Sequence, residues 1–175
     1  MEMAASPQPR RRSEKGFPLF RTIIIIGIVG AVLVGAGALS FFADQASRQV
    51  PLQIELYPGA ADWVQLRNCP ALQCTLYRVP GVTPELVADH YQTLLNEHNG
   101  NDSERCVRIP ETGAFPANEL AEGQVPYLYK CLFDRSGFGN TQFTEVIVMP
   151  GLYNVDPAFN TEGMTVIQYN QSWQP

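Results

Sequence analysis

The sequence predicts an α+β fold, with one N-terminal transmembrane helix followed by a mostly antiparallel sheet with one packed helix. Three observations lead to this prediction. Residues 22–43 carry no charged side chain. A single amphipathic segment with clear helix start and stop signals begins after Thr83. Short extended runs separated by turn-forming residues fill most of the remaining chain.

The N-terminal region is expected to be a disordered tail, residues 1–16, followed by a signal-anchor helix, residues 17–43. The tail is polar and has no apolar periodicity. As a helix rising about 1.5 Å per residue, the uncharged stretch spans the roughly 30 Å of bilayer hydrocarbon. A cleaved signal peptide is the alternative, because Ala38, Leu39 and Ser40 form a small-x-small triplet.

The charge distribution predicts the orientation of this anchor. Residues 1–43 carry five basic and two acidic side chains, whereas the rest of the chain carries seven basic and fifteen acidic ones. The positive-inside tendency then places the N-terminus in the cytoplasm. We therefore expect a single-pass protein of the plasma (inner) membrane, with an extracytoplasmic C-terminal domain.

Small residues recur at every fourth position within the anchor, at Gly27, Ala31 and Gly35. Such a stripe lets a second membrane helix approach closely, so the expected partners are the lipid bilayer and other membrane protein subunits. The alternative is that glycine and alanine are simply common in transmembrane helices.

A linker is expected over residues 44–51, followed by the extracytoplasmic domain over residues 52–175. Tyr57-Pro58-Gly59-Ala60 is typical of a turn. Extended runs are expected at residues 52–57, 63–66, 74–79, 106–109, 125–134, 143–149 and 164–169.

One helix is expected within this domain, beginning after Thr83. Threonine suits the N-cap, Pro84 suits the first helical position, and Gly100 follows the predicted end near His98. The segment has an apolar stripe at helical spacing that we expect to face the sheet, formed by Leu86, Val87, His90, Tyr91, Leu94 and Leu95.

All four cysteines, Cys69, Cys74, Cys106 and Cys131, follow the anchor. An even number of cysteines outside the cytoplasm permits two disulfides. The spacing favours Cys69 with Cys74 and Cys106 with Cys131, with free buried thiols as the alternative.

The sequence gives no support for catalysis, a cofactor or a metal site. It contains no glycine-rich phosphate loop, no nucleophile elbow and no metal-binding cysteine or histidine spacing. The acidic domain also argues against nucleic-acid binding, which requires a basic surface. We therefore expect a non-enzymatic protein.

Contact with a partner is expected to involve exposed aromatic residues outside the predicted strands and helix. Phe115 and Phe159 lie in two long connections, residues 110–124 and 150–163, and Trp173 lies near the C-terminus. Long connections in compact domains are often binding elements, and aromatic residues often anchor interfaces.

Two resemblances bear on the protein's class. The Tyr57-Pro58-Gly59-Ala60 motif and the helix that starts at Thr83-Pro84-Glu85 resemble those of uncharacterised bacterial membrane-anchored extracytoplasmic α+β domains. The Gly-Trp pair expected after that helix is missing, and the resemblance implies a fold rather than a reaction. Lys15-Gly16-Phe17 before an apolar helix is similar to the cleavage site of type IV pilin precursors, although Arg21 stands where those proteins carry glutamate.

Two functional hypotheses follow. The first is an accessory or interaction subunit of a membrane protein complex, with an exported globular domain. The second is an anchored extracytoplasmic domain that binds a ligand or envelope component through the two long connections. The sequence does not identify that small-molecule ligand. A type IV pilin-like protein is a third, less favoured hypothesis.

Overall fold

The computed structural model describes residues 18–67, 69–100, 104–121, 123–137 and 139–173. The chain divides into two compact units, residues 1–43 and 44–175, and each is considered by itself. The predicted tail and the Lys15-Gly16-Phe17 site lie outside the described residues.

Helix α1 (Pro18–Ser47) contains the predicted transmembrane segment. Proline suits the start of the helix because its missing N–H would be unpaired there in any case. Between residues 20 and 47 the helix is long and apolar enough to cross a membrane. It continues four residues beyond Ala43, so the first half of the predicted linker, residues 44–51, is helical.

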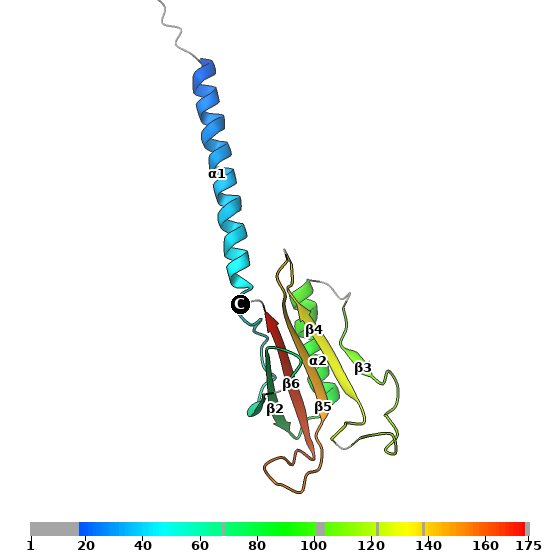
Figure 1. The fold of residues 1–175 in the computed structure, drawn as a ribbon. Coiled ribbons are helices and arrows are strands. Elements are labelled where there is room, and N and C mark those ends of the chain that lie inside the picture. The colour runs from blue at the N-terminus through cyan, green and yellow to red at the C-terminus, as the bar shows by residue number, and fades with distance from the viewer. Residues whose placement is uncertain (1–17, 68, 101–103, 122, 138, 174–175) are drawn as a thin grey trace, which may run out of the picture. The chain divides into compact units, whose positions relative to one another are not determined.

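The second unit contains one six-stranded antiparallel sheet with the strand order β1-β2-β6-β5-β4-β3 (Figure 1). A hairpin of β1 and β2 comes first, helix α2 follows, and β6 returns to lie between β2 and β5. This is the α+β fold that the sequence predicts. The elements are β1 (Ala61–Leu66), β2 (Gln73–Pro80), α2 (Pro84–Asn99), β3 (Val107–Ile109), β4 (Leu128–Asp134), β5 (Gln142–Pro150) and β6 (Met164–Trp173).

Helix α2 begins and ends where the sequence predicts. Thr83 occupies the N-cap position with extended backbone, although its side chain makes no capping hydrogen bond. Gly100 closes the helix in the left-handed conformation, with φ of 66°, which glycine adopts without steric cost. Leu86 does not belong to the buried stripe, since its side chain is 59% exposed, whereas Ala88 is buried.

The hydrophobic core lies between α2 and one face of the sheet. Val87, Tyr91 and Leu95 of the helix meet side chains from the central strands. Alternate residues of each strand point to this face, as the period of a β-strand requires. The strand residues buried here are Val79, Cys131, Phe133, Val146, Val148, Ile167 and Tyr169.

Residues 52–57 do not form the predicted strand. Instead, buried side chains of β5 and β6 hold the backbone of this region. Thr144 Oγ1 and Gln171 Nε2 both donate to the Leu52 carbonyl, at 2.6 and 2.9 Å. Gln142 Nε2 donates to the carbonyls of Ser47 and Val50, at 3.1 and 2.8 Å. Further along the segment, Tyr169 donates to the Glu55 carbonyl and Tyr57 N–H donates to Tyr91, both at 3.1 Å. Side chains thus take the place of a strand partner at residues 52, 55 and 57.

The turn predicted at residues 57–60 is present. Ala60 N–H donates to the Tyr57 carbonyl at 2.9 Å, and Gly59 has a φ of 84°. The turn leads directly into β1, which begins two residues after Gly59.

Both disulfides favoured by the spacing are formed. Cys69–Cys74 closes the connection between β1 and β2, and Cys106–Cys131 joins the residue before β3 to β4. Cys74 and Cys131 are fully buried. The disulfides indicate a domain that folds in an oxidising compartment.

Candidate functional site

The two faces of the sheet differ in how they are covered. Helix α2 lies against one face and contacts β4, β5 and β6, behind these strands in the view of Figure 1. On the opposite face, β5 and β6 present Ile147, Met149, Val166 and Gln168, which alternate with core residues. We call this the open sheet face. Its side chains are those of Leu76, Arg78, Val107, Ile109, Leu128, Lys130, Leu132, Glu145, Ile147, Met149, Val166, Gln168 and Asn170.

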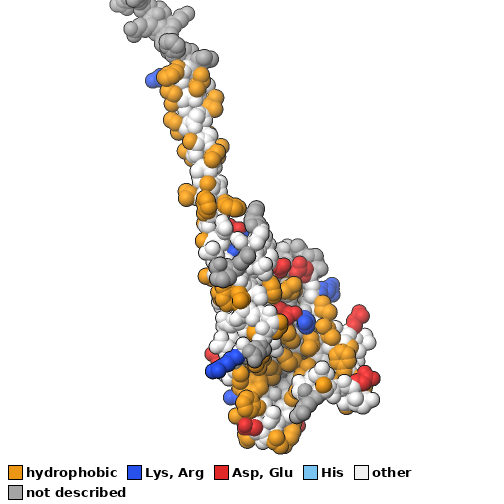
Figure 2. All heavy atoms as spheres, in the orientation of Figure 1, with side chains coloured by type: hydrophobic (Ala, Val, Ile, Leu, Met, Phe, Trp, Pro, Cys, Tyr) orange, Lys and Arg blue, Asp and Glu red, His pale blue; other side chains and the backbone are white. Residues whose placement is uncertain are grey.

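The open sheet face is largely apolar, and hydrophobic side chains cover much of the sheet domain in Figure 2. Val107 is 57% exposed and Leu132 is 46% exposed, although both lie on strands. An antiparallel sheet that faces water usually carries polar residues on its solvated side. Ile147 and Val166 at the centre of the face are buried within the domain, so it is the exposure of Val107 and Leu132 that requires an explanation beyond folding.

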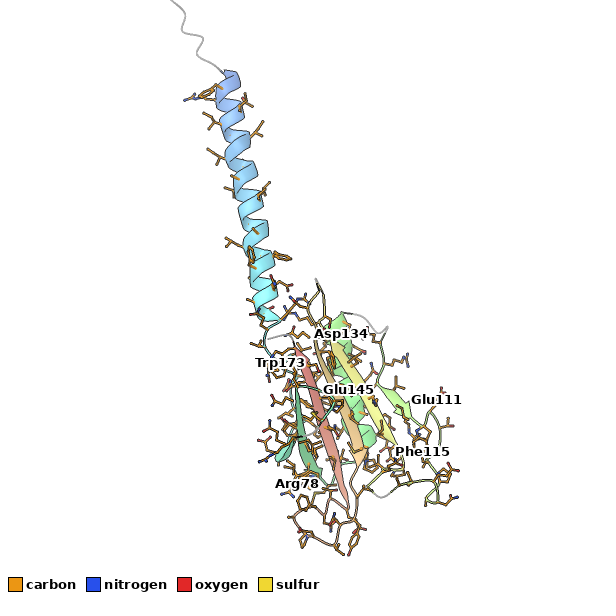
Figure 3. The ribbon with its side chains drawn as sticks, in the orientation of Figure 1. Arg78, Glu111, Phe115, Asp134, Glu145 and Trp173 are labelled. Carbon is orange, nitrogen blue, oxygen red and sulfur yellow. A yellow bond between two sulfur atoms is a disulfide. The ribbon has the colours of Figure 1, made fainter. Side chains whose placement is uncertain are left out.

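A short polar row crosses the middle of the open sheet face. Lys130 Nζ pairs with Glu145 Oε1 at 3.2 Å, and Asn170 Nδ2 donates to Glu145 Oε2 at 2.9 Å. Gln168 Nε2 donates to Asn170 Oδ1 at 2.7 Å. Glu145 thus lies at the centre of the sheet with both carboxylate oxygens paired (Figure 3). The charges of Lys130 and Glu145 offset each other within this row. A partner protein could therefore cover the row without leaving an unpaired charge.

A groove of about 690 Å³ lies at one end of the open sheet face. This volume is within the roughly 300–1,000 Å³ range of small-ligand sites. The strands contribute Trp63, Leu76, Met149, Val166 and Gln168. The connections contribute Gln124 and Val125 from one side, and Leu152, Tyr153, Asn154, Phe159 and Thr161 from the other.

Trp63 forms one wall of the groove because the register of β1 shifts between Asp62 and Val64. A bulge of this kind redirects a side chain that would otherwise follow the alternation of the strand. Trp63 Nε1 donates to the Ala158 carbonyl at 3.0 Å, and its ring centroid lies 6.5 Å from that of Phe159. The edge strand is thereby tied to the connection between β5 and β6.

That connection has its own internal hydrogen bonds. Thr161 Oγ1 accepts from the Leu152 N–H at 2.9 Å, and Gly151 N–H donates to the Met164 carbonyl at 2.8 Å. Gly151 has no space for a side chain, because a Cβ there would overlap the Thr161 carbonyl oxygen. These contacts fix the conformation of the connection that forms this wall of the groove.

The three aromatic residues predicted to contact a partner do not form one site. Phe159 lines the groove. Phe115 is exposed in the connection between β3 and β4, where its N–H donates to the Pro126 carbonyl at 2.8 Å. Trp173 ends β6 opposite Gln142, and Figure 3 places it far from Phe115.

The sequence did not single out Trp63, Tyr153 or Gln168 as site residues. The sequence predicts a strand at Trp63 but residue type does not reveal the bulge. Gln168 lines the groove from β6, whose place between β2 and β5 comes from long-range pairing. The predicted helix-packing residues Gly27, Ala31 and Gly35 lie on α1 at helical spacing. A Cβ at Gly27 or Gly35 would meet nothing within 4 Å in this single chain.

The predicted histidine of the helix stripe belongs to the core boundary rather than to the groove. The His90 ring lies 5.2 Å from Tyr57 and 5.3 Å from Tyr91, both edge-on. Among the residues that the structure describes, no three His, Cys, Asp or Glu side chains cluster as metal ligands would.

The groove can bind by stacking and by hydrogen bonding, since the described residues of its lining combine aromatic rings with amide side chains and include no charged residue. The open sheet face can bind by apolar contact around a paired polar row. No protein-family model matches this chain, and no curated protein or solved structure is detectably similar to it.

Proposed function

We propose that this chain is a non-catalytic single-pass membrane protein that serves as an accessory or interaction subunit of a membrane protein complex. Helix α1 anchors it in the plasma (inner) membrane with the N-terminus in the cytoplasm, and the sheet domain is extracytoplasmic. Three features support this arrangement: the apolar α1, the two disulfides of the sheet domain, and the basic residues that precede the anchor.

The open sheet face is the observation that carries the proposal. Exposed Val107 and Leu132 lie at the β3–β4 side of this face, next to buried Ile147. Contiguous apolar surface on a small domain is a feature of interaction sites. A partner subunit that covers this face would remove the exposed apolar area from water, which favours association.

Helix α1 supplies a second contact in the same proposal. The stripe of Gly27, Ala31 and Gly35 allows close packing against a neighbouring membrane helix. Contact through the helix holds the sheet domain close to its partner. The resulting high effective concentration strengthens the second contact and so raises the overall affinity of the subunit.

The test compares two leucines that are both exposed but lie on different faces. Leu132→Asp places a charge on the open sheet face, whereas the control Leu86→Asp places one on the outer side of α2, where Leu86 is 59% exposed. After extraction in mild detergent, native mass spectrometry of the unmodified chain is expected to show a stable complex. Leu132→Asp should release the chain from this complex, whereas Leu86→Asp should leave the complex intact. Recovery of the unmodified chain as a lone monomer would refute the proposal.

A second candidate function, an anchored domain that binds a ligand or envelope component, is favoured by the groove. Both long connections contribute to its lining, through Gln124 on one side and Phe159 on the other. A ligand-dependent rise in melting temperature would support this function. The two functions are compatible, because the groove occupies only one end of the open sheet face.

A further inference from the structure

The groove between Trp63 and the connection of residues 151–163 has a lining that restricts the chemistry of its ligand. Among the described residues, none of the side chains that line it is charged, although residues 44–175 carry fifteen acidic and seven basic residues. A charged ligand entering this groove would lose hydration without gaining an ion pair. The lining therefore favours a neutral ligand.

Three amide side chains line the groove, and each is held at one end. Gln168 Nε2 donates to Asn170 at 2.7 Å, Asn154 Oδ1 accepts from Asp156 N–H at 2.9 Å, and Gln124 Oε1 accepts from Ala121 N–H at 3.0 Å. The opposite ends make no hydrogen bond within the described part of the chain. One acceptor and two donor groups are thus left for a ligand, with their side chains already oriented.

These amides argue against a purely hydrocarbon ligand. Covering an amide with an acyl chain costs free energy because the amide loses water and gains no hydrogen bond. A ligand that fits must present hydroxyl or carbonyl groups to the amides and apolar faces to the rest of the lining.

Aromatic rings supply those apolar contacts. Trp63 is fixed by its hydrogen bond to the Ala158 carbonyl, Phe159 packs beside it, and Tyr153 is exposed on the same connection. The faces of aromatic rings are electron-rich and attract the slightly positive C–H groups of a sugar ring. A sugar also carries hydroxyl groups around its edge, where amide side chains can pair with them.

We propose that this groove binds a short neutral oligosaccharide, which stacks on Trp63, Tyr153 and Phe159 and hydrogen-bonds to the three amides. The inference rests on the second candidate function and specifies its ligand class. The ligand is a chain of uncharged sugar units, since the volume of about 690 Å³ exceeds what a single ring needs.

The experiment uses the full chain in lipid nanodiscs prepared without glycoside detergents, which would compete for the groove. Maltohexaose, cellohexaose and fully N-acetylated chitohexaose serve as neutral probes, and binding is followed by saturation-transfer NMR and titrated by tryptophan fluorescence. At least one probe is expected to bind with a dissociation constant of about 1 mM or lower. Absence of binding by all three overturns the inference.

Two exposed aromatic residues give a matched pair of variants. Tyr153→Ala is expected to weaken binding by about tenfold, which corresponds to roughly 1.4 kcal/mol. Phe115→Ala removes a similar exposed ring outside the groove and should leave the affinity unchanged. Equal affinities in the two variants would show that the sugar binds elsewhere, which also overturns the inference.

Gln168→Leu separates a sugar from an apolar ligand of similar size. The variant removes a polar contact from the groove while keeping its volume, so saccharide affinity should fall by about tenfold. A fluorescent fatty acid that binds the unmodified chain, and binds Gln168→Leu more tightly, would overturn the saccharide assignment while leaving the second candidate function standing. The interaction-subunit proposal is tested separately, through Leu132.

Discussion

Individual polar side chains determine how the start of the sheet domain is held. Gln142, Thr144 and Gln171 are buried and donate to carbonyls of residues 47–52. The alternation of apolar and polar residues does not predict these hydrogen bonds. Glutamine and threonine at core-facing positions interrupt the apolar pattern of a strand and give no sign of what they bind.

A second buried polar contact joins α2 to the sheet. The hydroxyls of Tyr91 and Tyr169 lie 2.8 Å apart, Tyr169 donates to the Glu55 carbonyl at 3.1 Å, and Tyr57 N–H donates to Tyr91 at 3.1 Å. Burial raises the pKa of Tyr169 well above its ordinary value, and the neighbouring Tyr91 adds to this rise. Burial likewise raises the pKa of Tyr91.

These raised pKa values predict alkaline destabilisation. A phenol with a higher pKa in the folded state stays protonated there, so its contribution to stability is complete below the unfolded value of about 10 and is lost as the pH rises above it. Tyr169→Phe should lower stability at pH 7 by about 1–3 kcal/mol, through the lost hydrogen bonds. It should also make the fall in melting temperature above pH 10 shallower.

The measurement is a set of thermal unfolding curves between pH 7 and pH 11.5. Tyr153→Phe is the control, because Tyr153 is exposed and its hydroxyl is not part of this contact. Identical slopes above pH 10 for the unmodified chain and Tyr169→Phe would contradict the role assigned to the buried tyrosines.

At the scale of elements, local signals predict where α2 and most of the strands lie along the chain. They do not predict which side of each element is buried. Thr83, Pro84 and Gly100 define the ends of the helix through backbone preferences that need no partner. The stripe that included Leu86 is partly wrong, because the sheet contacts the side of the helix that bears Val87, Ala88, Tyr91 and Leu95.

Two leucines of α2 test this placement. Leu95 is buried against the sheet, so Leu95→Ala is expected to lower the free energy of unfolding by about 2–5 kcal/mol. Leu86 is 59% exposed, so Leu86→Ala should change it by about 0.5 kcal/mol or less. Denaturant unfolding of both variants in the same detergent measures the difference. Equal losses would contradict the observed orientation of the helix.

At the scale of the whole molecule, the charge asymmetry and the disulfides support the proposed topology. Arg10, Arg11, Arg12 and Lys15 precede α1, Arg21 lies in its first turn, and both disulfides follow it. The proposed arrangement keeps this N-terminal basic cluster in the cytoplasm and the cysteines in an oxidising compartment. An uncleaved α1 would keep the domain attached to the membrane.

Reporter fusions behind Pro175 test this topology. Alkaline phosphatase, which requires disulfides, is expected to be active at this position, whereas a fluorescent protein that folds only in the cytosol should be dark. The chain should remain with membranes after a carbonate wash, which a cleaved signal peptide would not allow. The same fusions to a chain that lacks residues 22–43 provide the control. Cytosolic fluorescence from the full-length fusion would refute the extracytoplasmic placement.

The sequence alone determined the apolar anchor segment, the boundaries of α2, six of the seven extended runs, the turn at residues 57–60 and the favoured cysteine pairs. These features depend on neighbouring residues, on helix or strand periodicity, or on short separations along the chain. Phe159 lines the groove, and its contact with a partner stays a prediction.

Tertiary structure alone decided the strand order, the face that α2 covers, and the groove. Strands β2 and β6 pair across more than eighty residues, the bulge in β1 turns Trp63 toward the connection after β5, and Gln171 replaces a strand partner for residue 52. Such contacts depend on which distant surfaces pack together, and the free energy of that packing is a property of the assembled chain rather than of any local segment.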